Sequence, residues 1–559
     1  PAESVPILNE QSTPEKPLQN GKNLENGSHK DQRDRIESHS NPRGVLAQTL
    51  VAGAVFLLTT CCGIHVGYSA ILLPQLKNEN GTLYADDELG SWIASVQSIA
   101  SPVGAFLSGL LMDRWGRRTT LILCTIPFTA SWIMLAFATD HIYILVARAM
   151  AGFSSGLTIG PTQVLVGEIS EPHIRGILTG TNFMSHSVGI LLVYIMGTMT
   201  DWYIVSGIST VFPLLSFLAF LMLPESPVWL VRRNKIQEAE KALRWLRGGG
   251  IGLQLLSIHP KDTSISHPVA NNDSKLGPFE RSTLYLISQP TIRTFPDNES
   301  SLTIYSVKPL NQSTVFYFIQ VTSGTYLVIF YAVEVITQAG GREGLGIDRF
   351  LAAVLTAGDR LLFTFLMCFM LLKVGRRPLI LVSGFVQVLS SFLLGALLYL
   401  KNKINITDYE FPACKYLIII LMLLYVASNT CGYFSMPGIA MGELLPAKIR
   451  GSIGGYILGC TYIGFFITTK IFPWLCQNLA MHGVFAVFGI IGAVGTLFIY
   501  LFLPESEGKS LLEIENYFRQ PNLIWVDSLK TVLCTLTGKH EIAFIVNNRM
   551  SRRTANTLA

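Results

Sequence analysis

A short basic turn, Gly109-Leu110-Leu111-Met112-Asp113-Arg114-Trp115-Gly116-Arg117-Arg118, lies between two long apolar runs of the chain. A reduced copy, Leu371-Leu372-Lys373-Val374-Gly375-Arg376-Arg377, lies in the same setting much later. Both turns concentrate Lys and Arg beside a membrane, and short turns of this kind are retained on the cytoplasmic side. They therefore predict the topology at two points far apart in the sequence.

The composition indicates a membrane protein. The chain has 559 residues, of which 50% are hydrophobic and only 14% are charged, which is too apolar for a soluble protein of this size. The net charge of +5 comes from basic residues between apolar runs, so it indicates topology and not a nucleic-acid partner. The nine cysteines form no CxxC pair and no zinc spacing. No nucleotide site, metal cluster or nucleophile triad stands out, so we expect no cofactor, no metal and no enzyme.

Many apolar segments have the length of about 20 residues that is needed to cross a bilayer. They predict an all-α membrane protein with twelve transmembrane helices in two six-helix halves and a cytoplasmic helical insert between them. The predicted spans are residues 45–73, 91–112, 119–138, 141–163, 176–199, 204–223, 313–337, 347–371, 378–400, 415–440, 450–475 and 482–503.

The spans divide the chain into five parts. The predicted parts are a disordered cytoplasmic tail (1–42), the N-terminal half (43–223), a helical and then loose cytoplasmic insert (224–312), the C-terminal half (313–503) and a cytoplasmic tail (504–559). Asn80-Gly81-Thr82 and Asn405-Ile406-Thr407 fall in loops outside the cytoplasm, so Asn80 and Asn405 are predicted glycosylation acceptors. We expect an integral membrane protein of the plasma membrane with both termini in the cytoplasm.

Three signatures recur in the same order with a period of about 260–280 residues. They are Gly116-Arg117-Arg118 with Gly375-Arg376-Arg377, Glu168 and Arg175-Gly176 with Glu443 and Arg450-Gly451, and Leu223-Pro224-Glu225-Ser226 with Leu503-Pro504-Glu505-Ser506. This repetition predicts two similar halves around a central cavity, as in transporters whose halves rock against each other.

Charged residues at the cytoplasmic helix ends predict a gating network. Opposite charges there would pair across helices when the cytoplasmic side is closed and separate when it opens. Each exposed pair contributes only about 0–1 kcal/mol, but several together can bias a two-state equilibrium. Alternatively, the arginines serve only the topology, although topology requires no acids. The predicted network is Asp113, Arg114, Arg117, Arg118, Arg148, Glu168, Arg175, Arg376, Arg377, Glu443 and Arg450.

Taken together, these motifs resemble a sugar porter of the major facilitator superfamily, over nearly all of residues 45–510. The most similar members are the insect facilitated trehalose transporters. The resemblance implies twelve helices and alternating-access transport of hexoses or disaccharides. It rests on the repeated signatures, on Ala147–Gly152, and on Ser91-Trp92-Ile93, Val328–Tyr331, Met441–Gly451 and Thr468-Thr469-Lys470.

The chain departs from the sugar site that the resemblance implies. A Gln of the fifth helix is replaced by Phe183, an Asn of the eighth by Arg360, and a Trp of the tenth by Gly438. The seventh helix reads Gln320–Tyr326 and lacks one Gln and an Asn, and the eleventh has Thr461-Tyr462 in place of Asn-Trp. Losing the Trp is expected to enlarge the site.

The predicted substrate-binding residues combine these positions with one face of the seventh helix, where residues three or four apart are neighbours. A sugar site needs amides, hydroxyls and an aromatic face, since each unpaired sugar hydroxyl costs about 1–3 kcal/mol. The predicted set is Phe183, Gln320, Ser323, Tyr326, Tyr331, Glu334, Arg360, Gly438 and Tyr462.

Arg360 lies inside a span, where a charge costs about 2.5–3.5 kcal/mol on insertion scales. It contacts an ionic substrate or changes the sugar geometry, or it forms a structural ion pair with Asp359 or Glu334.

A different residue bears on whether transport is coupled to protons. Proton-coupled relatives have an Asp after the first-helix Gly-Tyr, where this chain has Ser69, which favours uniport, while Glu334 leaves coupling open.

Three functions follow. The first is facilitative transport of a sugar, trehalose or a hexose, through the lipid bilayer. The second is transport of a different, ionic small solute that uses Arg360. The third is a sensor or scaffold that keeps the fold and transports little.

Overall fold

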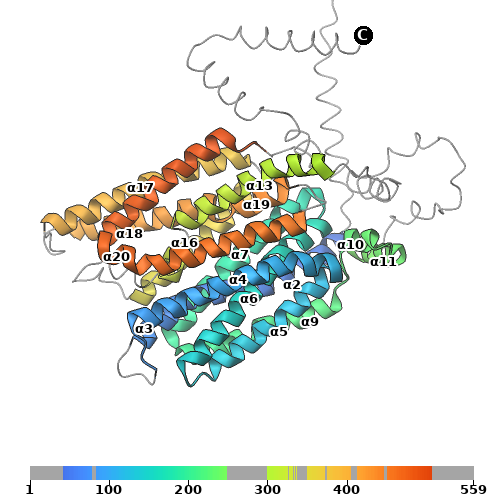
Figure 1. Cartoon of the computed structure of the whole chain (residues 1–559), viewed down its shortest axis with the longest axis horizontal. Coiled ribbons are helices and arrows are strands. Elements are labelled where there is room, and N and C mark those ends of the chain that lie inside the picture. The colour runs from blue at the N-terminus through green and yellow to red at the C-terminus, as the bar shows by residue number, and fades with distance from the viewer. Residues whose placement is uncertain are drawn as a thin grey trace, which may run out of the picture.

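The computed structural model describes residues 42–77, 83–248, 299–324, 326–331, 333, 335, 349–371, 374–404, 412–445 and 450–505. Within these residues every regular element is a helix, and the long helices lie roughly side by side as one bundle (Figure 1). The predicted acceptors Asn80 and Asn405 lie outside the described residues.

The N-terminal half begins with one span formed by α2 (Pro42–Gly67) and α3 (Ser69–Leu76), and the backbone of Tyr68 between them keeps helical dihedral angles. The last span of this half is divided in the same way into α8 (Trp202–Ser209) and α9 (Val211–Met222). The four spans between them are α4 (Asp87–Trp115), α5 (Arg117–Ala136), α6 (His141–Ile169) and α7 (Pro172–Met199).

Two short helices, α10 (Pro227–Arg232) and α11 (Ile236–Leu246), follow at one end of the bundle (Figure 1). Ser226 caps α10 by accepting a hydrogen bond from the Trp229 N–H, and Pro227 occupies the first turn, where its missing N–H costs nothing. We call this end of the bundle the insert end, and we call the end that carries α3 the α3 end.

The C-terminal half repeats the arrangement with more interruptions. A π-helical turn, η3, separates α18 from α19 and adds a residue to the helical turn. The elements are α13 (Glu299–Thr322), α14 (Leu327–Phe330), α16 (Arg349–Met370), α17 (Arg376–Ile404), α18 (Pro412–Asn429), η3 (Thr430–Phe434), α19 (Met436–Leu444) and α20 (Arg450–Phe502). Helix α13 begins before the predicted start of the seventh span at 313, because the apolar run marks only the membrane-embedded part of a helix.

Helix α20 accounts for the last two spans. Its 53 residues would measure about 80 Å, well over twice the roughly 30 Å hydrocarbon core of a bilayer. At Ala480 the backbone has φ 50° and ψ 174°, so the helix reverses direction there. Eleven described helices are long and apolar enough to cross a membrane, and α20 is one of them. Divided at Ala480, α20 supplies two spans, which gives the predicted twelve.

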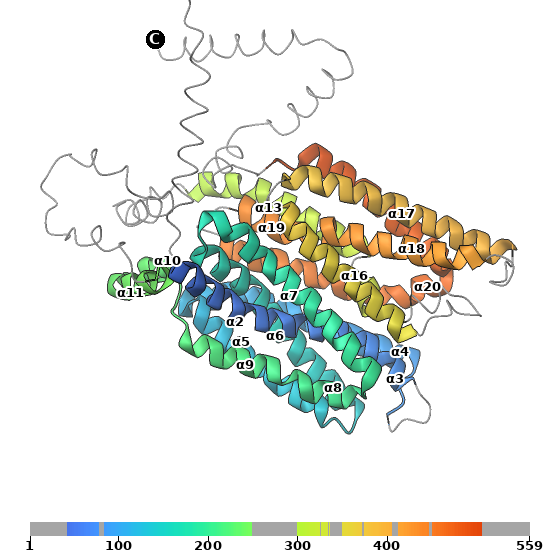
Figure 2. The same cartoon turned by 180° about the vertical axis from the view of Figure 1, so that it is seen from behind.

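The two halves meet along two pairs of helices. Helix α4 packs along α20, and α7 packs along α16 (Figures 1 and 2). Within the N-terminal half α4 also approaches α6 closely, since a Cβ at Gly152 would lie 2.1 Å from the Gln97 carbonyl oxygen. These contacts place polar residues of α4, α6 and α7 at the interface between the halves.

Candidate functional site: a cavity between the halves and a charge network at one end

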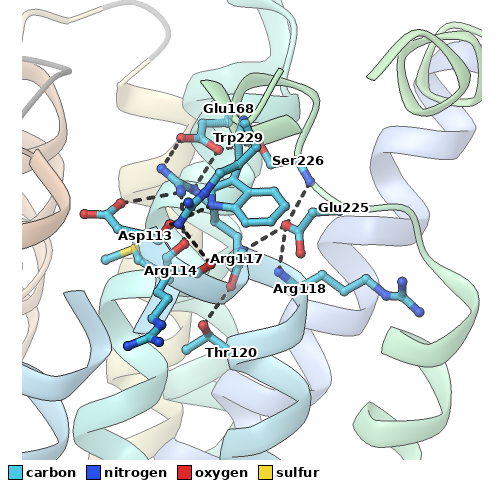
Figure 3. A network of polar contacts seen from close by, with 12 residues as sticks. Asp113, Arg114, Arg117, Arg118, Thr120, Glu168, Glu225, Ser226 and Trp229 are labelled. Carbon is cyan, nitrogen blue, oxygen red and sulfur yellow. Dashed lines mark hydrogen bonds and ion pairs between the residues drawn. The ribbon is translucent and has the colours of Figure 1, made fainter. Parts of the chain in front are cut away.

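A charge network joins the helices of the N-terminal half at the insert end (Figure 3). Arg117 donates from Nε and Nη2 to the two carboxylate oxygens of Glu168 at 3.1 and 3.0 Å, a forked geometry that strengthens an ion pair. Arg117 also lies 3.5 Å from Asp113, and the Ser226 hydroxyl donates to Glu168. One buried guanidinium therefore links α4, α5 and α6 to the start of α10.

Glu225 supplies the negative charge at the N-terminus of α5. Its carboxylate accepts from the backbone N–H groups of Arg117 and Arg118 at 2.9 and 3.0 Å. A helix N-terminus favours an anion because its first N–H groups lack helical partners. Gly116 precedes them with φ 102°, and a Cβ there would lie 2.3 Å from Glu225, so both the backbone and the space require glycine.

Cations occupy the opposite helix ends. Arg118 donates to the carbonyl oxygens of Phe220 and Leu221 at the end of α9. Arg233 and the Trp229 indole donate to the Asp113 carbonyl oxygen at the end of α4 at 2.9 and 3.0 Å. Positive groups favour helix C-termini, so these contacts satisfy carbonyls that have no partner in the helix.

The C-terminal half repeats the cap. Glu505 accepts from the backbone N–H groups of Arg376 and Arg377, each at 3.1 Å, as Glu225 does in the first half. The Arg377 guanidinium donates to the Tyr500 carbonyl oxygen at 2.6 Å, as Arg118 does at α9. The repeated signatures of the sequence thus correspond to one repeated local structure.

The hydrogen bonds and ion pairs of the predicted gating residues join helices of one half, and none of those between described residues crosses from one half to the other. Of this set, Arg114 contributes its carbonyl oxygen, which accepts from Arg233 at 3.0 Å. The side chains of Arg175, Glu443 and Arg450 lie outside the described residues.

Arg148 lies elsewhere than the predicted network. It is 20 residues before Glu168 on the same helix, so the two are separated by about 30 Å. Its guanidinium is fully buried at the junction between α2 and α3. There it donates to the His65 carbonyl oxygen at 3.0 Å and to the Ser69 hydroxyl. Arg148 therefore holds the α2–α3 junction and does not contact the charge network.

A cavity of about 100 Å³ lies between the halves. Both halves line it, with polar residues mostly from α2, α4, α6 and α7 and aromatic residues mostly from the C-terminal half. The lining includes Thr59, His65, Gln97, Ser98, Ser101, Ser155, Thr162, Gln163, Asn182, Phe183, His186, Tyr317, Gln320, Tyr326, Phe434, Gly438, Thr461, Tyr462 and Phe465.

Five of the predicted substrate-binding residues reach this cavity: Phe183, Gln320, Tyr326, Gly438 and Tyr462. Gln320 donates to the Phe434 carbonyl oxygen at 2.8 Å, and the rings of Tyr326 and Phe465 have centroids 4.2 Å apart. The Tyr462 and Ser155 hydroxyl oxygens are 3.5 Å apart across the two halves. The predicted set thus supplies one polar side chain and much of the aromatic wall.

Two others, Ser323 and Tyr331, do not line it. Ser323 is buried and donates to the Gln320 carbonyl oxygen of its own helix. Tyr331 lines a second cavity of about 400 Å³ at the α3 end, where its ring stacks on Phe472. Glu334 lies outside the described residues.

Arg360 is buried behind the cavity wall. Its guanidinium carbon lies 5.2 Å from the centroid of the Phe434 ring, a cation–π distance, and the His186 ring stacks on the same phenylalanine at 5.7 Å. Phe434 lines the cavity and Arg360 does not. The structure records no ion pair between Arg360 and Asp359, both of which it describes.

The Phe183 ring lies where a side chain at position 438 would be. A Cβ at Gly438 would lie 2.6 Å from Cζ of Phe183 and 3.1 Å from Nε2 of Gln163. The ring of the fifth span thus occupies the room that a tryptophan on the tenth would fill. In this conformation the Phe183 ring therefore fills the space directly beside Gly438.

The predicted set lacks the polar lining residues of the N-terminal half, among them Gln97, Gln163, Asn182 and His186. The available signal was an amide or imidazole inside an apolar span, which usually faces a protein interior or a water-filled path. The resemblance directed attention to the C-terminal half, where most of the implied sugar contacts lie.

The halves touch on both sides of the central cavity. At the α3 end the Lys470 ammonium of α20 donates to the Ser91 hydroxyl of α4 at 2.7 Å and lies 4.0 Å from the centroid of the Trp92 ring. Toward the insert end Gly180 of α7 approaches Cys368 of α16, since a Cβ at Gly180 would lie 2.7 Å from the sulfur. The two halves are therefore in contact on both sides of the central cavity.

Two repeated six-span halves around a central cavity define a membrane transporter with the major facilitator fold. The chain belongs to the sugar (and other) transporter family, whose model matches residues 60–518. This confirms the resemblance inferred from the sequence.

Relatives and solved structures agree. The chain is 29% identical over 477 residues to the facilitated trehalose transporter of Aedes aegypti, covering 85% of this chain and 56% of that protein. Against the protein of the same name from Culex quinquefasciatus it is 29% identical over 470 residues, covering 84% and 85% of the two chains. The chain thus spans about half the length of the first of these relatives and most of the second.

The solved structure of the proton:xylose symporter XylE bound to 6-bromo-6-deoxy-D-glucose is similar in fold. Its TM-score is 0.67 at 20% identity, over 84% of this chain and 100% of that one. An inward-open structure of XylE from E. coli gives a TM-score of 0.61 at 19% identity, over 84% and 99%. At these identities the likeness shows the fold.

Proposed function

We propose that this chain carries a sugar, trehalose or a hexose, across the plasma membrane by facilitative alternating access, with the insert end and both termini in the cytoplasm. The observation that supports this most is the enclosed cavity between the halves, which combines amides and hydroxyls with aromatic rings. Such a lining suits a sugar, whose hydroxyls need hydrogen-bond partners and whose ring faces are apolar. The trehalose transporters among its relatives favour the same substrate class.

Alternating access requires that one end of the interface opens while the other stays closed. At the α3 end the contacts to be broken include Lys470 with Ser91 and Trp92. At the insert end the charge network ties each half together, so each half moves as a rigid unit. We therefore propose that the network keeps the helix ends of a half in register during that movement, whereas the sequence predicted pairs that separate on opening.

The cavity must widen to hold its substrate. Pockets for small molecules usually measure about 300–1,000 Å³, whereas this one measures about 100 Å³. The structure thus represents a closed conformation, and sugar binding would favour a state in which the two halves lie further apart around the cavity.

Ser69 supports uniport. Arg148 is buried and donates to its hydroxyl, where a carboxylate would be able to take up and release a proton. A serine hydroxyl does not titrate in the physiological range, so this position offers no proton carrier. Transport then follows the sugar gradient alone, and no covalent step is involved.

The test is uptake of labelled trehalose and labelled glucose into oocytes, with surface expression measured in the same cells. We expect saturable uptake of at least one sugar above water-injected controls, unchanged by an imposed pH gradient. Uptake equal to the control despite surface expression would contradict transport of these sugars. Uptake that rises with an inward proton gradient would contradict uniport.

A further inference from the structure

The N-terminal half brings a set of amides and an imidazole to the cavity from three helices. Gln97 is on α4, Gln163 is on α6, and Asn182 and His186 lie one turn apart on α7. Gln97 and Asn182 are more than nine-tenths buried, with 3% and 7% of their surface exposed. These side chains are therefore held inside the protein and do not face bulk water.

Each of the four has a buried polar atom with no hydrogen-bond partner among the described residues. The atoms are Gln97 Oε1, Gln163 Oε1, Asn182 Nδ2 and His186 Nδ1. More than nine in ten buried polar groups in folded proteins are paired, and an unpaired one destabilises the fold. Four such atoms around one cavity indicate that their partners are supplied from outside the chain.

The wall from the C-terminal half differs. The side-chain amide nitrogen of Gln320 donates a hydrogen bond to the Phe434 carbonyl oxygen at 2.8 Å. Tyr326 packs on Phe465, and Phe434 stacks on His186. This wall therefore presents mainly aromatic surface to the cavity, with its chief amide already bonded within the protein.

We infer that the N-terminal half carries the hydrogen-bonding recognition of the substrate, through Gln97, Gln163, Asn182 and His186, while the C-terminal half supplies the apolar wall. The ligand class is a neutral polyhydroxylated molecule, and the inference rests on the proposed function. Amide oxygens accept hydrogen bonds and amide nitrogens donate them. A hydroxyl can pair with both, whereas a carboxylate only accepts hydrogen bonds. A neutral imidazole adds one further donor or acceptor, according to its tautomer.

The experiment uses the full chain in oocytes and compares Gln97→Leu and Asn182→Leu with Gln320→Leu. Leucine keeps most of the volume and removes the hydrogen bonds. Gln97→Leu and Asn182→Leu should each raise the KM for the transported sugar about fivefold or more, and Gln320→Leu should raise it less. Gln387→Leu is the matched control, since Gln387 is a buried amide of α17 that does not line the cavity, and its KM should stay unchanged.

Deoxy analogues identify the contact. The wild type should discriminate against at least one monodeoxy sugar as a competitor, and one of the N-terminal variants should lose that discrimination, which a merely structural role would not produce. If a leucine variant does not reach the surface, Gln97→Met and Asn182→Ala provide the same comparison.

The outcomes separate two claims. A raised KM in Gln320→Leu with unchanged values in Gln97→Leu and Asn182→Leu would overturn this inference and leave sugar transport standing. Absence of sugar uptake by the wild type would overturn the proposed function, and this inference with it.

Discussion

Single residues decide the shape of the cavity. Phe183 and Gly438 lie on different halves, and each makes room for the other at the centre of the interface. Core positions tolerate added volume poorly, since overpacking costs about 1–3 kcal/mol. The pair is therefore a contact through which the two halves limit each other's side-chain size.

We predict that Gly438→Trp lowers sugar uptake about tenfold, because the indole collides with the Phe183 ring and with Gln163. Phe183→Gln in the same chain removes the ring and should recover much of the loss. Uptake by the two single variants and the double variant, corrected for surface expression, checks this. A double variant no better than Gly438→Trp alone would contradict the compensation.

The sequence predicted part of the cavity lining. Tyr326 and Tyr462, chosen from the resemblance, line the cavity, whereas of the face chosen by helical spacing Gln320 lines it and Ser323 and Tyr331 do not. It could not predict that Phe434 lies between the cavity and Arg360, because the π-helical turn η3 changes the register of the tenth span. The roles of all these residues in binding stay predictions.

At the scale of elements, the acidic caps of α5 and α17 are the repeated device. Glu225 and Glu505 each accept two backbone N–H groups at a helix start, from a segment that follows the last span of the same half. The cap joins the start of the third span of a half to the end of that half. The recurrence of Leu-Pro-Glu-Ser in the sequence predicted a repeat. In the structure the Glu of each copy caps the N-terminus of a helix.

We predict that Glu225→Gln and Glu505→Gln each lower the free energy of unfolding by about 0.3–2 kcal/mol, because the neutral amide loses the interaction with the helix dipole. Midpoints of thermal unfolding of the purified protein in detergent measure this. Glu238→Gln is the control, since its pair with Lys235 is exposed on α11 and such pairs contribute little. Cap variants as stable as Glu238→Gln would argue against the caps.

At the scale of the whole molecule, the number and order of spans followed from apolar length and from the charge of the turns. Even the break at Ala480 falls between the predicted eleventh and twelfth spans. The contact between halves did not follow from the sequence. Lys470 was noted only as part of a motif, and its bond to Ser91 depends on how α20 lies against α4, which no local pattern specifies.

The central claim is that two halves alternate around one cavity that holds one sugar at a time. Counterflow in proteoliposomes tests it most directly, with purified protein, vesicles preloaded with unlabelled sugar, and a trace of labelled sugar outside. The account predicts a transient accumulation of label above its outside concentration, because each returning carrier is occupied by unlabelled sugar. Label that rises only to equality, at a rate that preloading leaves unchanged, would contradict it.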